Sequence, residues 1–578
     1  MKVLLSGNEA IASAAYENGI KFAAGYPGTP ATEILEEISA YQGINAQWSV
    51  NEKVALDVAV GASLGGLRSL VAMKHVGMNV ASDTLMTLSY VGVNAGLIIV
   101  TVDDPGMHSS QNEQDNRNYA KFAKIPLLEP SDSQEAKDFV RIALHISEKY
   151  DVPVFIRLTA RIAHTESIVK MSGNDKNLFV KKLSLNPAKY VMIPSNARAR
   201  RLFVEKRLKR LERFSEEFSF NRVEWKKGEL GIITSGLCYQ YARESCPNAS
   251  ILKLSLTYPL PNNLILNFAK KFPFIYVIEE LDPFLQEQIQ AMGVKVKGRE
   301  LFPFTGELSV DLIQKHLLRQ VPIKSFSFPK RTFSRSPSLC AGCAYLGLFY
   351  ILKKMKMIVI GDIGCYSLCA LPPLSSLETC ISMGSGLGIA QGLRSALNKK
   401  LKKRVVGVIG DSTFIHSGIP ALINSIYNKE ITTTIILDNQ ATAMTGGQDH
   451  PGTGVNIRKE KVPKTSFEAL TDSLGIKKTI IIDSYNLRQV KKVIRESLNY
   501  KYSSLIIARN PCVLKVPKRY KRSFQIIPGR CSSCKECLKL GCPALISKED
   551  KPYIDPQICI GCSLCRQICP RSAIKEAK

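Results

Sequence analysis

The sequence lacks any stretch of about 20 consecutive apolar residues, the length that a membrane-spanning helix needs. Its first residues, MKVLLSGNEAIAS, contain an apolar run too short for a signal peptide, with no small-residue cleavage site behind it. No basic stretch with interleaved aromatic residues, as expected of a nucleic-acid-binding segment, stands out. These absences argue against a membrane and a nucleic-acid partner, and we expect a cytoplasmic protein.

Acidic residues are scarce: 50 Asp and Glu stand against 78 Lys and Arg, which gives a formal net charge of +28. This sign predicts attraction to an anionic cofactor or an acidic partner without identifying either. Part of the excess lies at 196–214, where eight Lys and Arg residues and two Glu accompany leucines at helical spacing. The pattern predicts a basic amphipathic helix, which is either a solvated surface helix or a docking face for an acidic partner.

A chain of 578 residues is too long for one hydrophobic core, and its 45% apolar content is typical of globular domains. β-Branched runs such as 96–102 and 152–159 alternate with helical stretches, which predicts an α/β fold with buried parallel strands. We expect a first α/β domain at 1–165, a basic linker or insertion at 166–227, a smaller α/β domain at 228–320, a linker at 321–338, a third α/β domain at 339–515 and a cysteine-rich domain at 522–578.

Eight of the 16 cysteines lie in this last domain. Two-residue gaps favour metal ligation over disulfides in a reducing cytoplasm. The spacings are C-x2-C-x2-C-x4-C-P and C-x2-C-x2-C-x3-C-P, and the second is that of bacterial ferredoxins, in which the cysteine before proline ligates the other cluster. An α+β ferredoxin-type domain is expected, with one [4Fe-4S] cluster on Cys531, Cys534, Cys537 and Cys569 and a second on Cys559, Cys562, Cys565 and Cys542. The x4 gap leaves the partner of Cys542 less defined, and zinc also accepts four cysteines.

Two polar residues follow predicted neighbouring strands in the third α/β domain. Asp411 ends the apolar run at 404–411, and Asn439 ends the run at 432–439. Ligands of doubly wound sheets bind at the carboxyl ends of strands, and carboxylate and amide oxygens suit Mg²⁺. Turn chemistry is the alternative explanation for this pair.

The pair also resembles the thiamine diphosphate motif, in which Gly-Asp is followed about thirty residues later by Asn. The resemblance implies that Gly410, Asp411, Asn439 and the backbone carbonyl of Ala441 hold Mg²⁺ and the cofactor, although Ser412 replaces the usual glycine. Thiamine diphosphate also needs a carboxylate at its aminopyrimidine ring. Glu52, between a strand end and a small-residue helix, is the candidate, with a plain helix-start glutamate as the alternative.

Nearly the whole chain is similar to the α subunits of indolepyruvate ferredoxin oxidoreductases, within the 2-oxoacid:ferredoxin oxidoreductases. The segments that carry the resemblance are GYPGTP at 25–30, NEKVALDVAVGAS at 51–63, DDPGMHSSQNEQDNR at 103–117, CAGC at 340–343, GDIGCYSL at 361–368, AMTGGQDHPGTG at 443–454 and the terminal cysteine pattern. It implies Glu52 as the activating glutamate and Thr29 as a substrate-side residue. It also implies a pyrimidine-binding domain at 1–165, a transketolase C-terminal-like domain at 228–320 and a diphosphate-binding domain at 339–515.

The implied reaction is oxidative decarboxylation of an arylpyruvate such as indolepyruvate, with coenzyme A as acyl acceptor and an external ferredoxin as electron acceptor. A smaller β subunit is expected, in an αβ or (αβ)₂ assembly. The alternatives are a pyruvate or 2-oxoglutarate oxidoreductase, a non-oxidative thiamine-dependent decarboxylase, and an electron-transfer adaptor.

The resemblance further makes four cysteines candidate ligands of a third [4Fe-4S] cluster: Cys340, Cys343, Cys365 and Cys512. The alternative is that they are buried small hydrophobes. Cys238, Cys246, Cys369 and Cys380 fit no ligand pattern and are expected to be structural.

Overall fold

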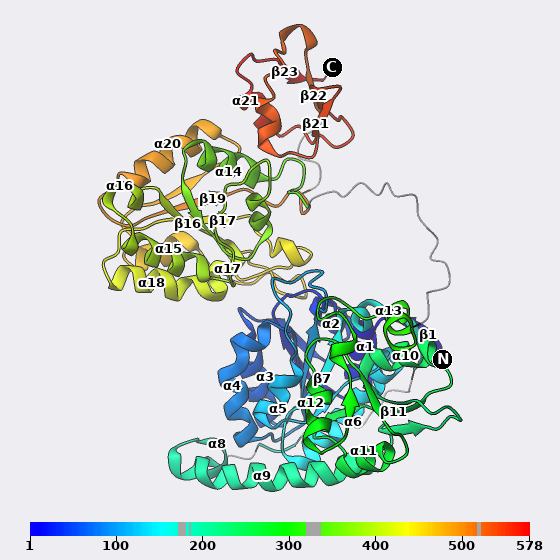
Figure 1. Ribbon diagram of the computed structural model, residues 1–578. Coiled ribbons are helices and arrows are strands. Elements are labelled where there is room, and N and C mark those ends of the chain that lie inside the picture. The colour runs from blue at the N-terminus through cyan, green and yellow to red at the C-terminus, as the bar shows by residue number, and fades with distance from the viewer. Residues whose placement is uncertain (172–180, 184–185, 320–336, 517–521, 578) are drawn as a thin grey trace. The chain divides into compact units, whose positions relative to one another are not determined.

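The computed structural model describes residues 1–578 except 172–180, 184–185, 320–336, 517–521 and 578, so most of the expected linker at 321–338 lies outside the described residues. The chain divides into two compact units, Met1–Lys330 and Arg331–Lys578 (Figure 1). Among the described residues, no helix is long and apolar enough to cross a membrane.

The first unit contains a seven-stranded sheet that is parallel except at one edge. Its strands, in spatial order, are β12 (Leu256–Tyr258), β6 (Leu127–Leu128), β7 (Val154–Thr159), β5 (Leu97–Asp103), β4 (Ser69–Lys74), β2 (Phe22–Gly25) and β3 (Asn45–Trp48). Every residue of β4, β5 and β7 is buried, which confirms the strands predicted at 96–102 and 152–159. Helices pack on these strands, including α3 (Glu52–Leu64) and α6 (Ser133–Tyr150).

A second sheet of five strands completes this unit, in the order β14 (Val296–Lys297), β13 (Ile275–Ile278), β10 (Gly231–Ser235), β11 (Ser250–Leu254) and β9 (Arg222–Glu224). Strand β9 lies inside the segment 166–227, which was predicted to be a basic linker or insertion, and pairs antiparallel with β11. Strand β12 follows β11 in the chain but pairs antiparallel with β6 of the other sheet. The chain thus passes from one sheet to the other within the first compact unit.

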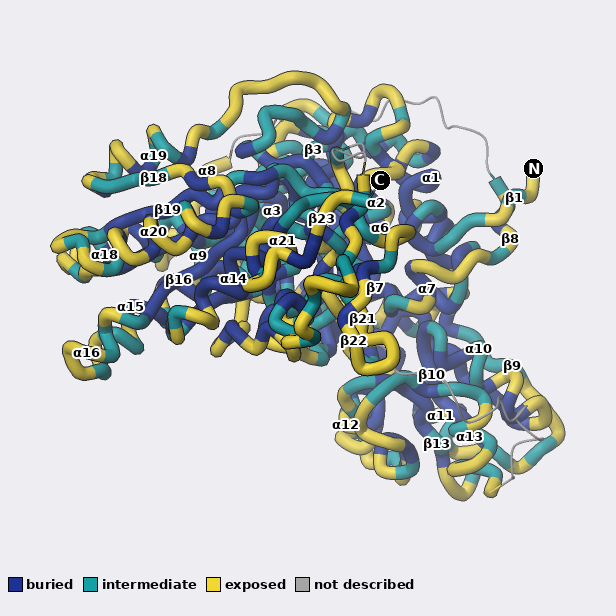
Figure 2. Tube along the Cα trace, turned by 90° about the horizontal axis from the view of Figure 1, so that it is seen from above, coloured by how far each residue is buried: buried dark blue, intermediate teal, exposed yellow. Residues whose placement is uncertain are grey.

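The basic segment forms the long helix α9 (Pro194–Glu216), as predicted. It packs against α4 (Gly77–Val91), and its Val204, Arg207 and Leu211 are buried. In Figure 2 the central strands are drawn in the buried colour, whereas much of the outer helical and loop surface is exposed. Most of the Lys and Arg residues of α9 are exposed, so the helix is amphipathic, with its cations mainly on the solvent side.

The second unit is built on a fully parallel sheet in the order β15 (Ile358–Ile360), β16 (Val405–Gly410), β17 (Thr433–Asp438), β19 (Ser504–Arg509) and β18 (Thr479–Ile482). Helices α14 (Ala344–Lys354) and α20 (Leu487–Leu498) pack together. Helices α15 (Ser385–Ala396) and α18 (Ile419–Tyr427) form a second pair. Strands β16 and β17 are neighbours in this order, as predicted for the two strands that lead to Asp411 and Asn439.

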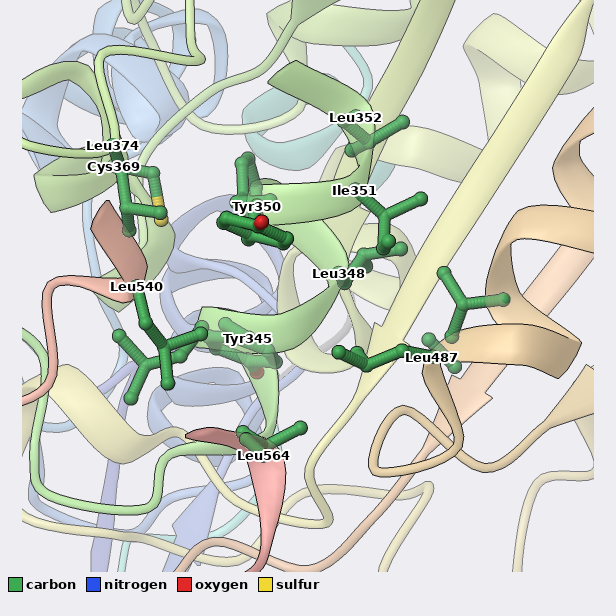
Figure 3. Packing of buried hydrophobic residues seen from close by; sticks show 14 of the residues in the cluster. Tyr345, Leu348, Tyr350, Ile351, Leu352, Cys369, Leu374, Leu487, Leu540 and Leu564 are labelled. Carbon is green, nitrogen blue, oxygen red and sulfur yellow. The ribbon is translucent and has the colours of Figure 1, made fainter. Parts of the chain in front are cut away.

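The cysteine-rich domain follows, with β20 (Phe524–Ile526) paired to β23 (Ile574–Glu576), a hairpin of β21 (Leu545–Lys548) and β22 (Lys551–Ile554), and the short helix α21 (Leu564–Ile568). Its Leu540 and Leu564 belong to the same buried cluster as Tyr345 and Leu348 of α14 (Figure 3). The Tyr350 hydroxyl donates to Glu536 Oε1 at 2.7 Å. The domain is therefore packed on the parallel-sheet domain of its own unit.

Candidate functional site

Two side chains whose oxygens can ligate a metal ion, Asp411 and Asn439, follow the carboxyl ends of β16 and β17. Asp411 and Asn439 are 2% and 8% exposed, and the backbone N–H of Gln440 donates to Asp411 Oδ2 at 2.8 Å. The N–H of Ala441 donates to Asn439 Oδ1 at 3.1 Å, and His450 Nε2 lies 3.2 Å from Asp411 Oδ2. Buried carboxylate and amide oxygens at neighbouring strand ends fit the hard-oxygen preference of Mg²⁺.

A group of four cysteines begins beside Asn439. The backbone N–H of Cys512 donates to the carbonyl oxygen of Asn439 at 2.9 Å. Burial raises the pKa of the Cys365 thiol to about 11, with smaller contributions from the Cys512 and Cys340 thiols. Burial also raises the pKa of Cys343, and Cys365, Cys340 and Cys512 add to the effect. The structure therefore gathers Cys340, Cys343, Cys365 and Cys512, hereafter the Cys340 group.

A fifth cysteine lies beside this group. Cys369 is fully buried, and its pKa is raised first by burial and then by the Cys343 and Cys365 thiols. The sequence pattern gave it no role, because it follows Cys365 by four residues in a region without ligand spacing. It also belongs to the apolar core that α14 helps to form.

The eight terminal cysteines form two groups, each drawing on both sequence motifs. Burial raises the pKa of Cys537 to about 11, assisted by the thiols of Cys569, Cys531 and Cys534. These four residues also line one hollow, and we call them the Cys531 group. The pKa of Cys562 is raised to about 11 by burial and then by Cys542 and Cys559. Cys542, Cys559, Cys562 and Cys565 form the Cys542 group, so the x4 gap does not separate Cys542 from its predicted partners.

These gatherings of thiols fit iron–sulfur clusters on chemical grounds. Thiols that face one another resist deprotonation because their thiolates repel, and bound iron ions remove that penalty by ligating the thiolate form. Each group offers four sulfur ligands, the number that a [4Fe-4S] cluster takes.

Gly342 joins the Cys340 group to the Cys542 group. Its φ is +70°, and a Cβ there would lie 2.3 Å from Ile560 Cδ1 and 3.4 Å from Cys562 Cβ. Burial raises the pKa of Cys542, and a hydrogen bond from the Gly342 backbone partly offsets this. The Tyr485 hydroxyl donates to the Gly342 carbonyl oxygen at 2.8 Å, which fixes the loop. The cysteines therefore continue from the strand-end site into the terminal domain.

In the first unit, Glu52 opens helix α3 and is 6% exposed. The preceding Asn51 caps the helix by accepting a hydrogen bond from the Val54 N–H at 2.9 Å. Gly77, the first residue of α4, lies so close that a Cβ would stand 2.7 Å from Glu52 Cγ. The fold thus holds this carboxylate at a helix start between two helices.

Thr29 lies in the loop after β2, and its carbonyl oxygen accepts a hydrogen bond from the Ser109 hydroxyl at 3.2 Å. Lys74, at the end of β4, donates to the Ser109 carbonyl oxygen at 2.6 Å. Burial lowers the pKa of Lys74 to about 8, against an opposing effect of Asp104. Lys74 was not predicted as a candidate site residue from the sequence. A lysine at the carboxyl end of a buried strand is nevertheless a pattern that can indicate a perturbed side chain at a site.

Two other polar residues of the first unit, His75 and Arg117, have structural partners. His75 is fully buried, with Nε2 3.2 Å from the Asn112 carbonyl oxygen. Arg117 forms buried ion pairs with Asp115, at 2.5 Å, and with Glu279, at 2.7 Å. The latter pair links the two sheets of the first unit.

Comparison with known proteins gives three family matches. Residues 13–207 match the thiamine-diphosphate-binding domain of pyruvate flavodoxin/ferredoxin oxidoreductase, residues 362–508 the C-terminal TPP-binding domain of thiamine pyrophosphate enzymes, and residues 552–575 a 4Fe-4S binding domain. The second match contains Asp411 and Asn439, and the third contains four terminal cysteines.

Full-length relatives decide the family. The indolepyruvate oxidoreductase subunit IorA of Archaeoglobus fulgidus is 38% identical over 100% of this chain and 98% of its own. That of Methanothermobacter marburgensis is 38% identical over 99% and 97%. The chain belongs to the IorA family. A solved 2-oxoglutarate:ferredoxin oxidoreductase from Magnetococcus marinus aligns at 16% identity with a TM-score of 0.46, over 55% of this chain and 65% of that one.

Membership confirms the predicted fold class, which is α/β thiamine-diphosphate-binding domains followed by a 4Fe-4S domain. The chain is an oxidoreductase that uses thiamine diphosphate and [4Fe-4S] clusters.

Proposed function

We propose that this chain is the catalytic α subunit of a ferredoxin-dependent enzyme that oxidatively decarboxylates arylpyruvates, with indolepyruvate as the typical substrate. The products are an arylacetyl-coenzyme A, CO₂ and reduced ferredoxin. One observation carries the proposal: the Cys340 group touches Asn439 on one side and, through Gly342, the Cys542 group on the other. An electron source and a terminal electron carrier are thereby joined within one unit.

The strand-end residues of the second unit have the cofactor-binding role in this proposal. Asp411, Asn439 and the carbonyl oxygen of Ala441 would hold Mg²⁺, which would neutralise charge on the diphosphate, and Gly410 would let the backbone approach the cofactor. Bound thiamine diphosphate supplies the electron sink that lets a 2-oxoacid lose CO₂. Glu52 is the carboxylate that activates the aminopyrimidine ring, and Thr29 lies on the substrate side.

The cysteine groups provide the outlet for electrons. The Cys340 group holds a third [4Fe-4S] cluster, and the Cys542 and Cys531 groups hold the two clusters of the terminal domain. Iron–sulfur clusters accept single electrons, so oxidation of one substrate molecule supplies two electrons in succession. An external ferredoxin receives them, and coenzyme A takes the acyl group.

A smaller β subunit completes the enzyme, in an αβ or (αβ)₂ assembly. The names of the full-length relatives describe them as subunits, which supports this part of the proposal. The same names support indolepyruvate as the substrate.

The test is anaerobic copurification with the β subunit, followed by iron analysis and ferredoxin reduction across a panel of 2-oxoacids. We expect about twelve irons per chain, corresponding to three clusters. Arylpyruvates should reduce ferredoxin faster than pyruvate or 2-oxoglutarate do, and only when coenzyme A is present.

Two outcomes would contradict the proposal. Release of aldehyde from indolepyruvate without bleaching of the iron–sulfur absorbance would indicate a non-oxidative decarboxylase. Full activity of Glu52→Ala would indicate that the α/β domains only support an electron carrier. Cys512→Ser tests the third cluster separately, since it should lower iron to about eight per chain.

A further inference from the structure

The two terminal cysteine groups differ in their access to solvent. The Cys542 group faces Gly342 and contains no fully exposed cysteine, whereas Cys534 of the Cys531 group is exposed. If electrons arrive through Gly342, as the proposed function requires, the Cys542 group is the inner group. The Cys531 group is then the outer one, from which electrons leave.

A hollow of about 430 Å³ lies directly beside the outer group. Cys531 and Ser533 line it, together with residues of strands β20 and β22. Most of its lining residues are apolar, among them Phe524, Ile526, Pro528, Pro552, Tyr553 and Pro556, whereas Ser523 and Gln525 are polar. The volume lies within the roughly 300–1,000 Å³ typical of ligand-binding pockets, so it can receive an apolar side chain of a docking protein.

Exposed cations lie at this hollow and at the outer group. Lys551 lines the hollow and is exposed, and Arg571 lines the cavity between the four outer cysteines. Arg530 is exposed immediately before Cys531. Lys535, which also lines the outer-group cavity, pairs with Asp550. An apolar centre with a cationic rim is the anatomy of an interface that selects an acidic partner.

We infer that this face, made by the hollow and by Arg530, Lys551 and Arg571, is the docking site of the electron acceptor, and that the acceptor is a small acidic iron–sulfur protein. The inference rests on the proposed function and specifies its last step. Each encounter would pass one electron, which leaves the iron–sulfur cluster that the outer group would hold and reduces the acceptor. The two electrons from one 2-oxoacid molecule therefore need two encounters.

The test uses the assembled holoenzyme with its partner subunit and a purified acidic [4Fe-4S] ferredoxin. In the double variant Arg530→Glu/Lys551→Glu, neither residue is a cluster ligand. We expect the dissociation constant for ferredoxin, measured by surface plasmon resonance, to rise about tenfold or more at low ionic strength. The KM for ferredoxin should rise in parallel. Iron content and the reduction rate of the small dye methyl viologen should stay at wild-type values.

Helix α20 of the same unit provides the matched control. Its Lys491 and Arg495 are exposed, and Lys491→Glu/Arg495→Glu makes the same change in net charge. This variant should bind ferredoxin like the wild type. Ser523→Trp, which fills the hollow without a charge change, should weaken ferredoxin binding and leave the methyl viologen rate unchanged.

Unchanged ferredoxin affinity in Arg530→Glu/Lys551→Glu would overturn the docking site, as would an equal loss of affinity in the α20 control. Binding of nucleic acid or anionic vesicles that these two substitutions abolish, with ferredoxin affinity intact, would do the same. Failure of the proposed function looks different. In that case the wild type would reduce no methyl viologen with any 2-oxoacid, whereas ferredoxin affinity would still respond to the variants.

Discussion

At the scale of single residues, the position of Glu52 depends on the missing side chain of Gly77. A Cβ at Gly77 would lie 2.7 Å from Glu52 Cγ and 2.9 Å from Oε1, which is closer than packed atoms approach. We therefore expect Gly77→Ala to shift the carboxylate. Glu52 activates the cofactor in the proposed function, and misplacement of such a group by about 1 Å should lower kcat by about 10- to 100-fold. Steady-state kinetics on the anaerobic holoenzyme measures this.

Gly61→Ala is the matched control for this change. Gly61 lies inside the same helix as Glu52, and a Cβ there meets nothing within 4 Å. Alanine should leave kcat unchanged and should stabilise α3 slightly, by about 0.5–1 kcal/mol. Equal kinetics of the two variants would show that Gly77 does not set the position of the carboxylate.

Asp362, which follows β15, predicts a pH dependence of stability. Burial raises its pKa to about 7, although the Tyr366 hydroxyl donates to it. The folded state therefore binds more protons than the unfolded state between about pH 4 and pH 7, and stability falls as pH rises through this window. Asp362→Asn should remove this loss, which amounts to at most about 4 kcal/mol above pH 7. Urea midpoints from pH 5 to pH 8 test it, with the exposed Asp472→Asn as the control.

At the scale of elements, helix α9 is held in part by a buried cation, in addition to Arg200, which donates to the Tyr90 carbonyl oxygen at 2.6 Å. Arg207 is 1% exposed and donates to the carbonyl oxygens of Ser89 at 2.7 Å and Asp151 at 2.8 Å, while burial lowers its pKa to about 10. Arg207→Met leaves both carbonyls without this donor, and we expect a loss of about 1–3 kcal/mol despite the relief of burying a charge. Hydrogen exchange of the α9 amides should quicken, and urea unfolding should shift to a lower midpoint.

The exposed Arg213, on the same helix, is the control for this prediction. Arg213→Met should change stability by less than about 0.5 kcal/mol. If the α9 amides exchange alike in both variants, Arg207 does not hold the helix.

Element-level features also explain how far sequence reasoning could reach. The strands that end at Asp411 and Asn439 were predictable, because buried parallel strands are continuous apolar runs and their carboxyl ends share one edge. The placement of β12 was not, since the side-chain pattern of an edge strand does not state which sheet it joins. The Cys340 group could not be predicted with certainty for a similar reason. Its four cysteines come from separate segments of the second unit, so their assembly depends on tertiary packing.

At the scale of the whole molecule, the terminal domain is integrated into the second unit. Leu540 and Leu564 share the buried cluster of α14, and Gln567 Nε2 donates to the Tyr485 carbonyl oxygen at 2.7 Å. The Leu487 N–H donates to Gln567 Oε1 at 3.1 Å. These contacts hold the Cys542 group against Gly342, whereas a free ferredoxin on a linker would meet the Cys340 group only transiently.

Substitution of Gly342 tests this integration. Alanine there would carry a Cβ 2.3 Å from Ile560 Cδ1 on a backbone with a φ of +70°, so the loop or the Ile560 side chain must move and the contact with the terminal domain loosens. We expect Gly342→Ala to slow ferredoxin reduction several-fold with iron content retained. In rapid-mixing experiments with a 2-oxoacid, absorbance changes of the terminal clusters should lag behind CO₂ release. Gly529→Ala, in the same domain with nothing within 4 Å of its Cβ position, should behave as wild type. A Gly342→Ala enzyme with unaltered ferredoxin reduction would show that electrons reach the terminal domain by another contact.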